Sequence, residues 1–258
     1  MFETGDARIQ LAVVAETATI TLARPEKLNA LDKSMILALE RASLIIDADA
    51  KIKVAIITGA ADRAFCAGGD IEAWSDEAPE DFGLQWVRLG HRAFDALARL
   101  RQPLIAVLNG SAMGGGFELA ACADFRIAEP HIKLSLPETG LGIIPGWSGT
   151  QRAVRRFGAQ IIRRMSLAGE SLNADQALTL GLIDQVTQQG QSMNAAHILA
   201  QKISERSVFA TSATKMMINA AEGEDTERAL EALGGIAAAH SHELKSGLAA
   251  FRAKKQKR

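Results

Sequence analysis

Two glutamates, Glu118 and Glu138, stand among residues that are otherwise small or apolar. Glu118 falls in the first turn of an expected buried helix, and Glu138 follows Pro137 in a loop without another charge until Arg152. If both carboxyl groups line one pocket, burial and mutual repulsion raise the pKa of at least one, which suits general acid–base chemistry. The alternatives are an acidic residue favoured by a helix dipole and an ordinary solvated loop glutamate.

Glycine-bearing stretches follow two of the expected strands, at Ala64–Ile71 and at Gly110–Gly116. Because glycine has no Cβ, the backbone there can approach a ligand closely, and N–H groups at a helix start carry the positive end of its dipole. Two converging main-chain N–H groups would stabilise an oxygen whose negative charge develops during a reaction. For the three consecutive glycines, tight packing of a helix on a strand is the alternative.

The elements that must position these residues alternate between apolar runs and helical patterns. Short apolar or alternating runs predict strands. They are Leu11–Val14, Thr17–Leu22, Lys53–Thr58, Leu104–Leu108, Phe125–Ala128 and Ile132–Leu136. Helical patterns cover Lys33–Asp47, Leu84–Leu100 and Phe117–Ala123. Asp32 is the expected N-cap of the first helix. Because strand, loop and helix recur, the sequence predicts an α/β fold with parallel strands.

The remaining segments predict loops and then a mostly helical C-terminal part. Ser75–Phe82 is acidic, contains Pro79 and predicts a mobile loop, and residues 137–150 predict a long loop rich in turn residues. Asn173 is expected to cap a short helix that Gly181 closes. The later patterns are strand-like Leu182–Val186 and helical Gln151–Leu167, Met193–Glu205, Val208–Ala221 and Thr226–Ala250. We therefore expect a boundary near residue 200.

Whole-chain composition limits the classes of function. The 258 residues are 48% hydrophobic and 23% charged, and the formal net charge of −1 argues against bulk attraction to nucleic acid or a membrane surface. Cys66 and Cys122 are far apart among small apolar residues, so we expect them to pack as small hydrophobic side chains in a reducing compartment. Without a secretory signal pattern or a stretch of ~18 apolar residues, the expected location is cytoplasmic.

Several other kinds of site lack their required pattern. Gly110–Gly116 matches neither a dinucleotide-binding fingerprint nor a phosphate-binding loop. Thr150 stands where a nucleophile elbow around Ser148 would need its last glycine. His240 and His242 lie two residues apart, which on a helix directs them to different faces. The three tryptophans are scattered and there is no tyrosine, so no platform for stacking nucleic-acid bases is expected.

Five motifs, taken in their order, resemble the enoyl-CoA hydratase/isomerase family, also called the crotonase superfamily. They are Arg24–Leu31 (RPEKLNAL), Ala64–Ile71 (AFCAGGDI), Asn109–Leu119 (NGSAMGGGFEL), Leu136–Gly146 (LPETGLGIIPG) and Gly149–Arg152 (GTQR). The resemblance covers essentially the whole chain. It implies an α/β fold with a spiral core of ββα units over residues 1–200 and a helical trimerisation region over residues 201–258. It also implies an acyl-CoA ligand and assembly as a homotrimer or a dimer of trimers.

The resemblance further implies an enoyl-CoA hydratase, which adds water to a trans-2-enoyl-CoA thioester. In that reaction the N–H groups of Gly69 and Gly115 would stabilise the enolate-like thioester oxygen. Glu118 would position and deprotonate water, and Glu138 would protonate C2. No cofactor is implied, because coenzyme A is part of the substrate, and no metal is implied.

Contacts to coenzyme A are also implied by the resemblance. The adenine and pantetheine path would be lined by the segment that comprises Ala67, Gly68, Gly69, Asp70 and Ile71. Lys27 and the basic residues of the C-terminal run, Lys254, Lys255, Lys257 and Arg258, would meet phosphate groups. The C-terminal residues would reach the ligand of a neighbouring subunit.

Some positions depart from the pattern of the family. Leu136 replaces a glutamine that many hydratases have, and Trp147 and Ser148 replace smaller residues. The indole of Trp147 would lie near the acyl end of the substrate and reshape the choice of acyl group. Carnitinyl-CoA dehydratases also carry paired glutamates, so that reaction stays open, as do isomerisation and decarboxylation. A non-catalytic RNA-binding relative is disfavoured by the near-neutral charge.

Overall fold

The computed structural model describes residues 2–240, 242 and 246. Contacts divide the chain into two units, Met1–Ser212 and Ala213–Arg258, and each is described by itself. The assignment of the segment after residue 200 to subunit assembly stays a prediction. The basic run at residues 254–258 lies outside the described residues, as does most of the expected helix beyond Ala239.

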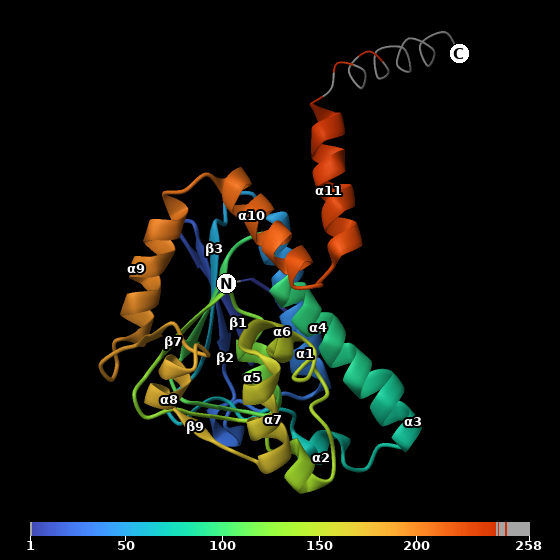
Figure 1. Cartoon of the computed structure of the whole chain (residues 1–258), viewed down its shortest axis with the longest axis vertical. Helices are drawn as coiled ribbons and strands as arrows, with labels where there is room; N and C mark the ends of the chain where they lie inside the picture. Colours follow the sequence, from blue (N-terminus) through green and yellow to red (C-terminus); the bar gives the residue numbers. More distant parts are fainter. Residues whose placement is uncertain (1, 241, 243–245, 247–258) are drawn as a thin grey trace. The chain divides into compact units, whose positions relative to one another are not determined.

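The larger sheet has six strands in the order β1-β2-β3-β5-β7-β10 (Figure 1). Their bounds are Ile9–Val14, Thr17–Leu22, Val54–Gly59, Leu104–Leu108, Phe125–Ala128 and Gln185–Val186. β1 and β2 form an antiparallel hairpin, and every later neighbour in the sheet is parallel. The predicted α/β class with parallel strands is therefore confirmed.

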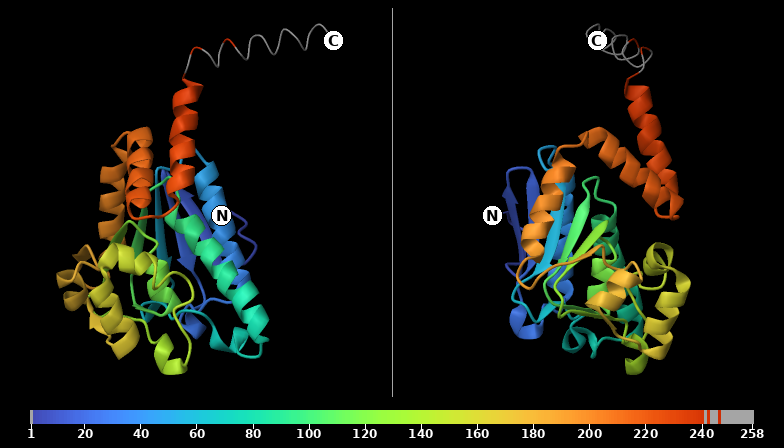
Figure 2. Two further views of the ribbon diagram at one scale, coloured as in Figure 1. Left: turned by 45° about the vertical axis from the view of Figure 1, so that its right-hand side comes forward. Right: turned by 60° about the vertical axis from the view of Figure 1, so that its left-hand side comes forward.

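Helices cover both faces of this sheet, which explains the continuous apolar runs of β3 and β5. On one face, Val54 and Ile105 pack against Ala196 and Ala200 of α9 (Ser192–Ser204), which runs along the sheet in Figure 2. On the other face, the alternate residues belong to a core shared with α1 (Lys33–Ala48) and α4 (Arg88–Ala98).

A second sheet, β4-β6-β8-β9, is built from short strands. They are Ala64–Cys66, Ser111–Met113, Lys133–Ser135 and Leu172–Asn173. The sequence prediction treated residues 64–66 and 111–113 as parts of glycine loops, and that was wrong. Two- and three-residue strands are too short for a periodic signal, so only their pairing across the sheet reveals them. β4, β6 and β8 are parallel, and the glycine stretches follow directly after β4 and β6.

Side chains cap two of the helices as the sequence predicted. Asp32 accepts a hydrogen bond from the Met35 N–H at 3.0 Å at the start of α1. Asn173 accepts one from the Gln176 N–H at 2.9 Å, and Gln176 returns the contact, which completes a capping box on α8 (Ala174–Thr179). The short helix after Asn173 is confirmed.

The segment from residue 75 to residue 82 differs from its predicted loop. After α2 (Ile71–Trp74), a helix begins at Pro79 as α3 (Pro79–Asp81) and continues through a π-helical stretch, Phe82–Val87, into α4. Proline is well tolerated in the first helical turn, where its missing N–H would be unpaired in any case. The helix that the sequence predicted from Leu84 therefore begins earlier, at Pro79.

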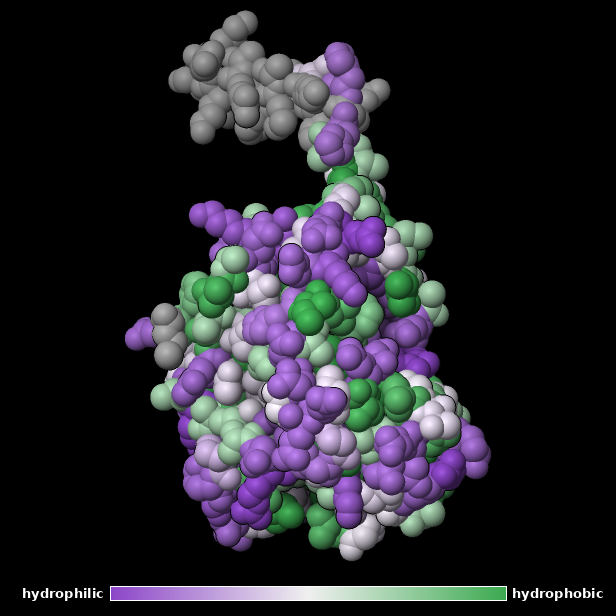
Figure 3. All heavy atoms as spheres, turned by 90° about the vertical axis from the view of Figure 1, so that its left-hand side faces the viewer, coloured by the Kyte–Doolittle hydropathy of each residue, from purple (hydrophilic) through white to green (hydrophobic). Residues whose placement is uncertain are grey.

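Several further helices complete the described chain. They are α5 (Gly115–Ala120), α6 (Arg152–Phe157), α7 (Ala159–Ala168), α10 (Val208–Ala221) and α11 (Thr226–Ala239), with 3-10 turns at Pro25–Lys27 and Glu138–Leu141. Gly158, at φ +89°, interrupts what the sequence predicted as one helical region. Among the described helices, none is both long and apolar enough to cross a membrane. On the face in Figure 3, apolar side chains are interspersed among hydrophilic ones.

Both cysteines are buried and unbridged, as expected for small packed side chains. Burial raises the pKa of the Cys66 thiol to about 12, so the thiolate that reacts with electrophiles is suppressed.

Candidate active site

The two glycine stretches meet because β4 and β6 are parallel neighbours, so the loops at their carboxyl ends leave the same edge of the sheet. A Cβ built on Gly68 would lie 2.9 Å from the Met113 carbonyl oxygen and 3.1 Å from the Gly115 nitrogen. Gly68 also has a φ of +102°, which other residues rarely adopt. Glycine at this position therefore permits the contact between the loops.

The main-chain N–H groups of Gly69 and Gly115 lie at this junction. Gly115 is the first residue of α5, where an N–H has no partner within the helix. Among the described residues, neither N–H donates a hydrogen bond to another protein group. Both glycines line the same pocket, so both donors are available to one ligand.

Glu118 comes from the first turn of α5 and is almost completely buried. Its Oε1 accepts hydrogen bonds from the N–H of Trp147 at 2.7 Å and the N–H of Gly149 at 2.6 Å. Burial raises its pKa to about 7; the Trp147 N–H lowers it and the charge of Glu138 raises it. No hydrogen bond is made to Oε2 within the described part of the chain, so that oxygen is the one available to water or substrate.

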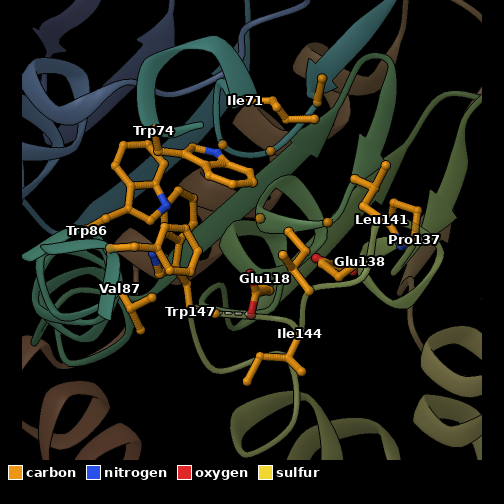
Figure 4. A pocket seen from close by; sticks show the side chains of 18 residues that line it. Ile71, Trp74, Trp86, Val87, Glu118, Pro137, Glu138, Leu141, Ile144 and Trp147 are labelled. Atoms are coloured by element: carbon orange, nitrogen blue, oxygen red, sulfur yellow. Dashed lines mark hydrogen bonds between the residues drawn. The ribbon is translucent and has the colours of Figure 1, made fainter. Parts of the chain in front are cut away.

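Glu138 enters the pocket from the 3-10 turn that follows β8. Its Oε2 is buried and has no hydrogen-bond partner among the described residues, and burial raises its pKa. Its Oε1 packs against Gly114, where a Cβ would lie 2.8 Å from that oxygen. Figure 4 shows Glu118 between Glu138 on one side and a group of indoles on the other.

The pocket encloses about 570 Å³, part of it open to solvent. The structure brings together in its lining most of the residues that the sequence singled out. They are Ala67, Gly68, Gly69, Ile71, Gly115, Glu118, Glu138 and Trp147. Within the described residues, no group of three or more His, Cys, Asp or Glu side chains is arranged to hold a metal ion.

Lys27 and Asp70 are not brought into this lining. The Lys27 ammonium is exposed and pairs with the carboxylate of Glu72. The Asp70 carboxylate pairs with the Arg24 guanidinium at 2.8 Å and accepts a hydrogen bond from the Glu72 N–H, so it fixes the start of α2. These contacts give Asp70 a structural role, and its expected contact with coenzyme A, like the phosphate contact of Lys27, stays a prediction.

The three tryptophans, scattered along the sequence, gather beside Gly69. A Cβ on Gly69 would lie 2.9 Å from the ring of Trp86, 3.3 Å from that of Trp147 and 3.6 Å from Nε1 of Trp74. The sequence interpretation missed this cluster, because the residues belong to three elements. The sequence carried one hint of it: Trp86, Gly90 and Phe94 are spaced four residues apart, which places them on a single helical face, and this face contacts Trp147.

The sequence also did not reveal a contact between His91 and Ser148, in the loop that holds Glu118. His91 Nδ1 is 3.1 Å from Ser148 Oγ, and burial lowers the pKa of His91. Ser148 has a φ of +81°, unusual for a residue with a side chain, and its two neighbours supply the N–H groups that hold Glu118. The contact with His91 therefore helps to hold Ser148 in its strained backbone conformation in the loop beside the pocket.

Comparison with known proteins gives the same family that the motifs resemble. The family model for enoyl-CoA hydratase/isomerase matches residues 13–258. A crotonyl-CoA hydratase from Syntrophomonas wolfei is 34% identical over 246 residues, covering 93% of this chain and 92% of that protein. A carnitinyl-CoA dehydratase from Salmonella paratyphi A is 37% identical over 203 residues, covering 78% of this chain and 76% of its own.

Solved structures agree with this assignment. An enoyl-CoA hydratase from Bacillus anthracis superposes with a TM-score of 0.81 at 31% identity, covering 96% of both chains. The fold is thus the crotonase fold that the resemblance implied, and the chain belongs to the enoyl-CoA hydratase/isomerase family.

Proposed function

We propose that this chain is an enoyl-CoA hydratase, which reversibly adds water in the syn sense to a trans-2-enoyl-CoA thioester and gives a 3-hydroxyacyl-CoA. The observation that carries the proposal is the convergence of Glu118 and Glu138 in one pocket, beside the N–H groups of Gly69 and Gly115. A reaction with two proton transfers and a developing oxyanion needs this set of groups.

The two glycine N–H groups would hold the thioester oxygen. As water attacks C3, the electron pair of the double bond moves toward C2 and the thioester carbonyl, whose oxygen gains negative charge. Donors that already point at this oxygen stabilise the charge without reorganising. Because they belong to loops fixed by β4 and β6, their spacing is set by the sheet.

The two glutamates would divide the proton transfers. In the reactive state the pair would carry one proton: the carboxylate is on Glu118, whose Oε1 has two N–H donors, and the proton is on Glu138, whose buried Oε2 has no donor among the described residues. Glu118 then takes the proton that the attacking water loses, and Glu138 gives its proton to C2. Proton exchange with solvent returns the pair to its initial state.

The proposal includes no cofactor. Coenzyme A belongs to the substrate, and the addition of water to a double bond is neither a net oxidation nor a net reduction, so no redox cofactor is needed. Two relatives support the proposal: one is a crotonyl-CoA hydratase and another a short-chain-enoyl-CoA hydratase. Assembly as a homotrimer or dimer of trimers and a cytoplasmic location are further proposals. Light scattering coupled to size-exclusion chromatography would measure the assembly.

Dehydration of carnitinyl-CoA is a second candidate, and the indole cluster favours it. Indole faces attract quaternary ammonium groups, and Trp74, Trp86 and Trp147 all line the pocket close to Gly69. A trimethylammonium group at the end of a four-carbon acyl chain is the kind of cation that such rings bind. The 37% identical carnitinyl-CoA dehydratase supports the same candidate.

The deciding experiment adds the purified protein to crotonyl-CoA and follows the absorbance of the conjugated enoyl thioester. Crotonobetainyl-CoA, a 3-enoyl-CoA and a malonyl-type thioester are measured in parallel. We expect the fastest turnover with crotonyl-CoA. Faster conversion of crotonobetainyl-CoA would favour the second candidate, and turnover of only the other thioesters would exclude both. Salt-dependent RNA binding without any turnover would indicate a binding protein instead.

A further inference from the structure

The pocket has an open aliphatic mouth and a closed aromatic end. At the mouth, Ile71, Leu141 and Ile144 are 48%, 59% and 76% exposed. At the other end, Trp86 and Trp147 also line the pocket, but each is only 3% exposed. Figure 4 shows the indoles together on one side of Glu118, away from Leu141.

The indole of Trp147 lies directly against the two glycines that would hold the thioester oxygen. A Cβ on Gly115 would be 2.6 Å from Cζ3 of Trp147, and one on Gly69 would be 3.3 Å from its Cη2. The ring is therefore in van der Waals contact with this backbone. An acyl chain that leaves the thioester toward the closed end meets the indole within a few carbon atoms.

One helical face holds the indole in place from behind. The ring centroid of Trp147 is 5.3 Å from that of Trp86 and 5.1 Å from that of Phe94. Between these two residues is Gly90 of α4, where a Cβ would lie only 2.0 Å from Trp147 Nε1. Glycine in a helix interior is unfavourable, but here it leaves the space that the indole occupies.

Coenzyme A is a large polar group, whereas the aromatic end is lined by the nearly fully buried rings of Trp86 and Trp147. The thioester must therefore be oriented with coenzyme A at the mouth and the acyl group toward Trp147. We propose that Trp147, seated against Gly90, is the end wall of the acyl site and restricts the substrate to short acyl groups. This assignment rests on the proposed function, since it takes an acyl-CoA as the ligand.

The test compares the wild-type chain with Trp147→Ala and Trp147→Phe on crotonyl-CoA and trans-2-decenoyl-CoA. The wild type should prefer the shorter substrate by at least ~10-fold in kcat/KM. Room for each further buried methylene is worth about 4-fold. Trp147→Ala should therefore raise the decenoyl-to-crotonyl ratio by at least ~10-fold, and Trp147→Phe should fall between. The Trp147 N–H that holds Glu118 is kept in both variants.

Gly90→Ala is the matched control, because it changes the contact between Gly90 and the Trp147 indole at Gly90 and leaves Trp147 itself unchanged. Its Cβ displaces the indole, so the kcat/KM for crotonyl-CoA should fall several-fold, and the double variant Gly90→Ala/Trp147→Ala should recover much of that loss. Effects that simply add would contradict a direct contact between the two positions. Thermal melts show whether each variant is folded.

Calorimetric binding of saturated butyryl-CoA and decanoyl-CoA separates this proposal from the proposed function. The protein could hydrate no enoyl-CoA while Trp147→Ala still raises the affinity for decanoyl-CoA relative to butyryl-CoA by at least ~10-fold. That result would support Trp147 as the end wall and exclude the hydratase assignment. If crotonyl-CoA is hydrated but neither ratio changes in the variant, the wall is wrong and the hydratase assignment survives. Wild-type turnover of decenoyl-CoA equal to that of crotonyl-CoA would also overturn the wall.

Discussion

The main-chain nitrogen of Trp147 lies 2.7 Å from Oε1 of Glu118, while the indole of the same residue packs against Gly69 and Gly115. One residue thus contacts both the proposed base and the proposed acyl site, through different atoms. Because the contact with Glu118 uses only the backbone, the side chain at position 147 can change without removing that hydrogen bond. Substitutions of Glu118 and of Trp147 are therefore expected to affect different kinetic properties.

Replacing Glu118 by glutamine removes the proposed base but keeps the acceptor for both N–H groups. We expect kcat for crotonyl-CoA to fall at least ~10²-fold, with little change in KM. Steady-state kinetics on the folded variant measures both constants. A rate within a few-fold of wild type would show that Glu118 takes no proton from water.

Glu138→Gln removes the proposed donor to C2 and leaves an amide of nearly the same shape. The expected loss in kcat is again at least ~10²-fold. If the two glutamates act in one concerted step, the double variant with Glu118→Gln should lose little more than either single variant. Losses that multiply in the double variant would instead indicate independent roles.

The pH dependence of turnover should report the raised pKa of Glu118. Burial raises that pKa to about 7, and the base must be ionised to accept a proton from water. Hence kcat should rise with pH until about pH 7, where the Glu118 carboxylate forms, and level off above it. Rates of crotonyl-CoA hydration between pH 5 and pH 9 test this. An acidic limb centred near the ordinary glutamate value of 4.5 would contradict it.

Glu118 should also make the protein less stable as pH rises. Its pKa is about 7 in the folded chain and near 4.5 when unfolded, so the folded state binds more protons in that window. The free energy of unfolding contributed by this group is then largest below pH 4.5 and decreases as pH rises through 7. Urea unfolding at pH 5 and pH 8 should show that Glu118→Gln stabilises the protein by on the order of 1–3 kcal/mol more at pH 8 than at pH 5.

Lys27 tests the contact expected with a phosphate of coenzyme A. Its ammonium pairs with Glu72 at the surface, so a phosphate would have to compete with that carboxylate. Lys27→Ala should raise KM for crotonyl-CoA by roughly 2- to 5-fold without changing kcat, and Glu72→Gln should lower KM. Both effects should shrink at high salt. If KM is the same in all three proteins, Lys27 does not bind the substrate.

Several features of this molecule were predictable from the sequence because the physical signal for each is local. The apolar runs at Lys53–Thr58 and Leu104–Leu108 predicted buried strands, which the structure has as β3 and β5. The capping roles of Asp32 and Asn173 follow from their position before helical patterns. The ordered motifs indicated the family, which the comparisons confirm. Glu118 and Glu138 were also singled out by their apolar neighbours, although their meeting was only a hypothesis.

Tertiary structure alone decided which of these residues share a pocket. Parallel pairing of β4 with β6 brings Gly69 and Gly115 together across more than 40 residues of chain, and strands of three residues give no periodic pattern that would predict the pairing. The same is true of the indoles beside Gly69, and of His91 with Ser148. Local sequence determines the period, caps and burial of an element, whereas contacts between distant segments depend on how the sheets align them.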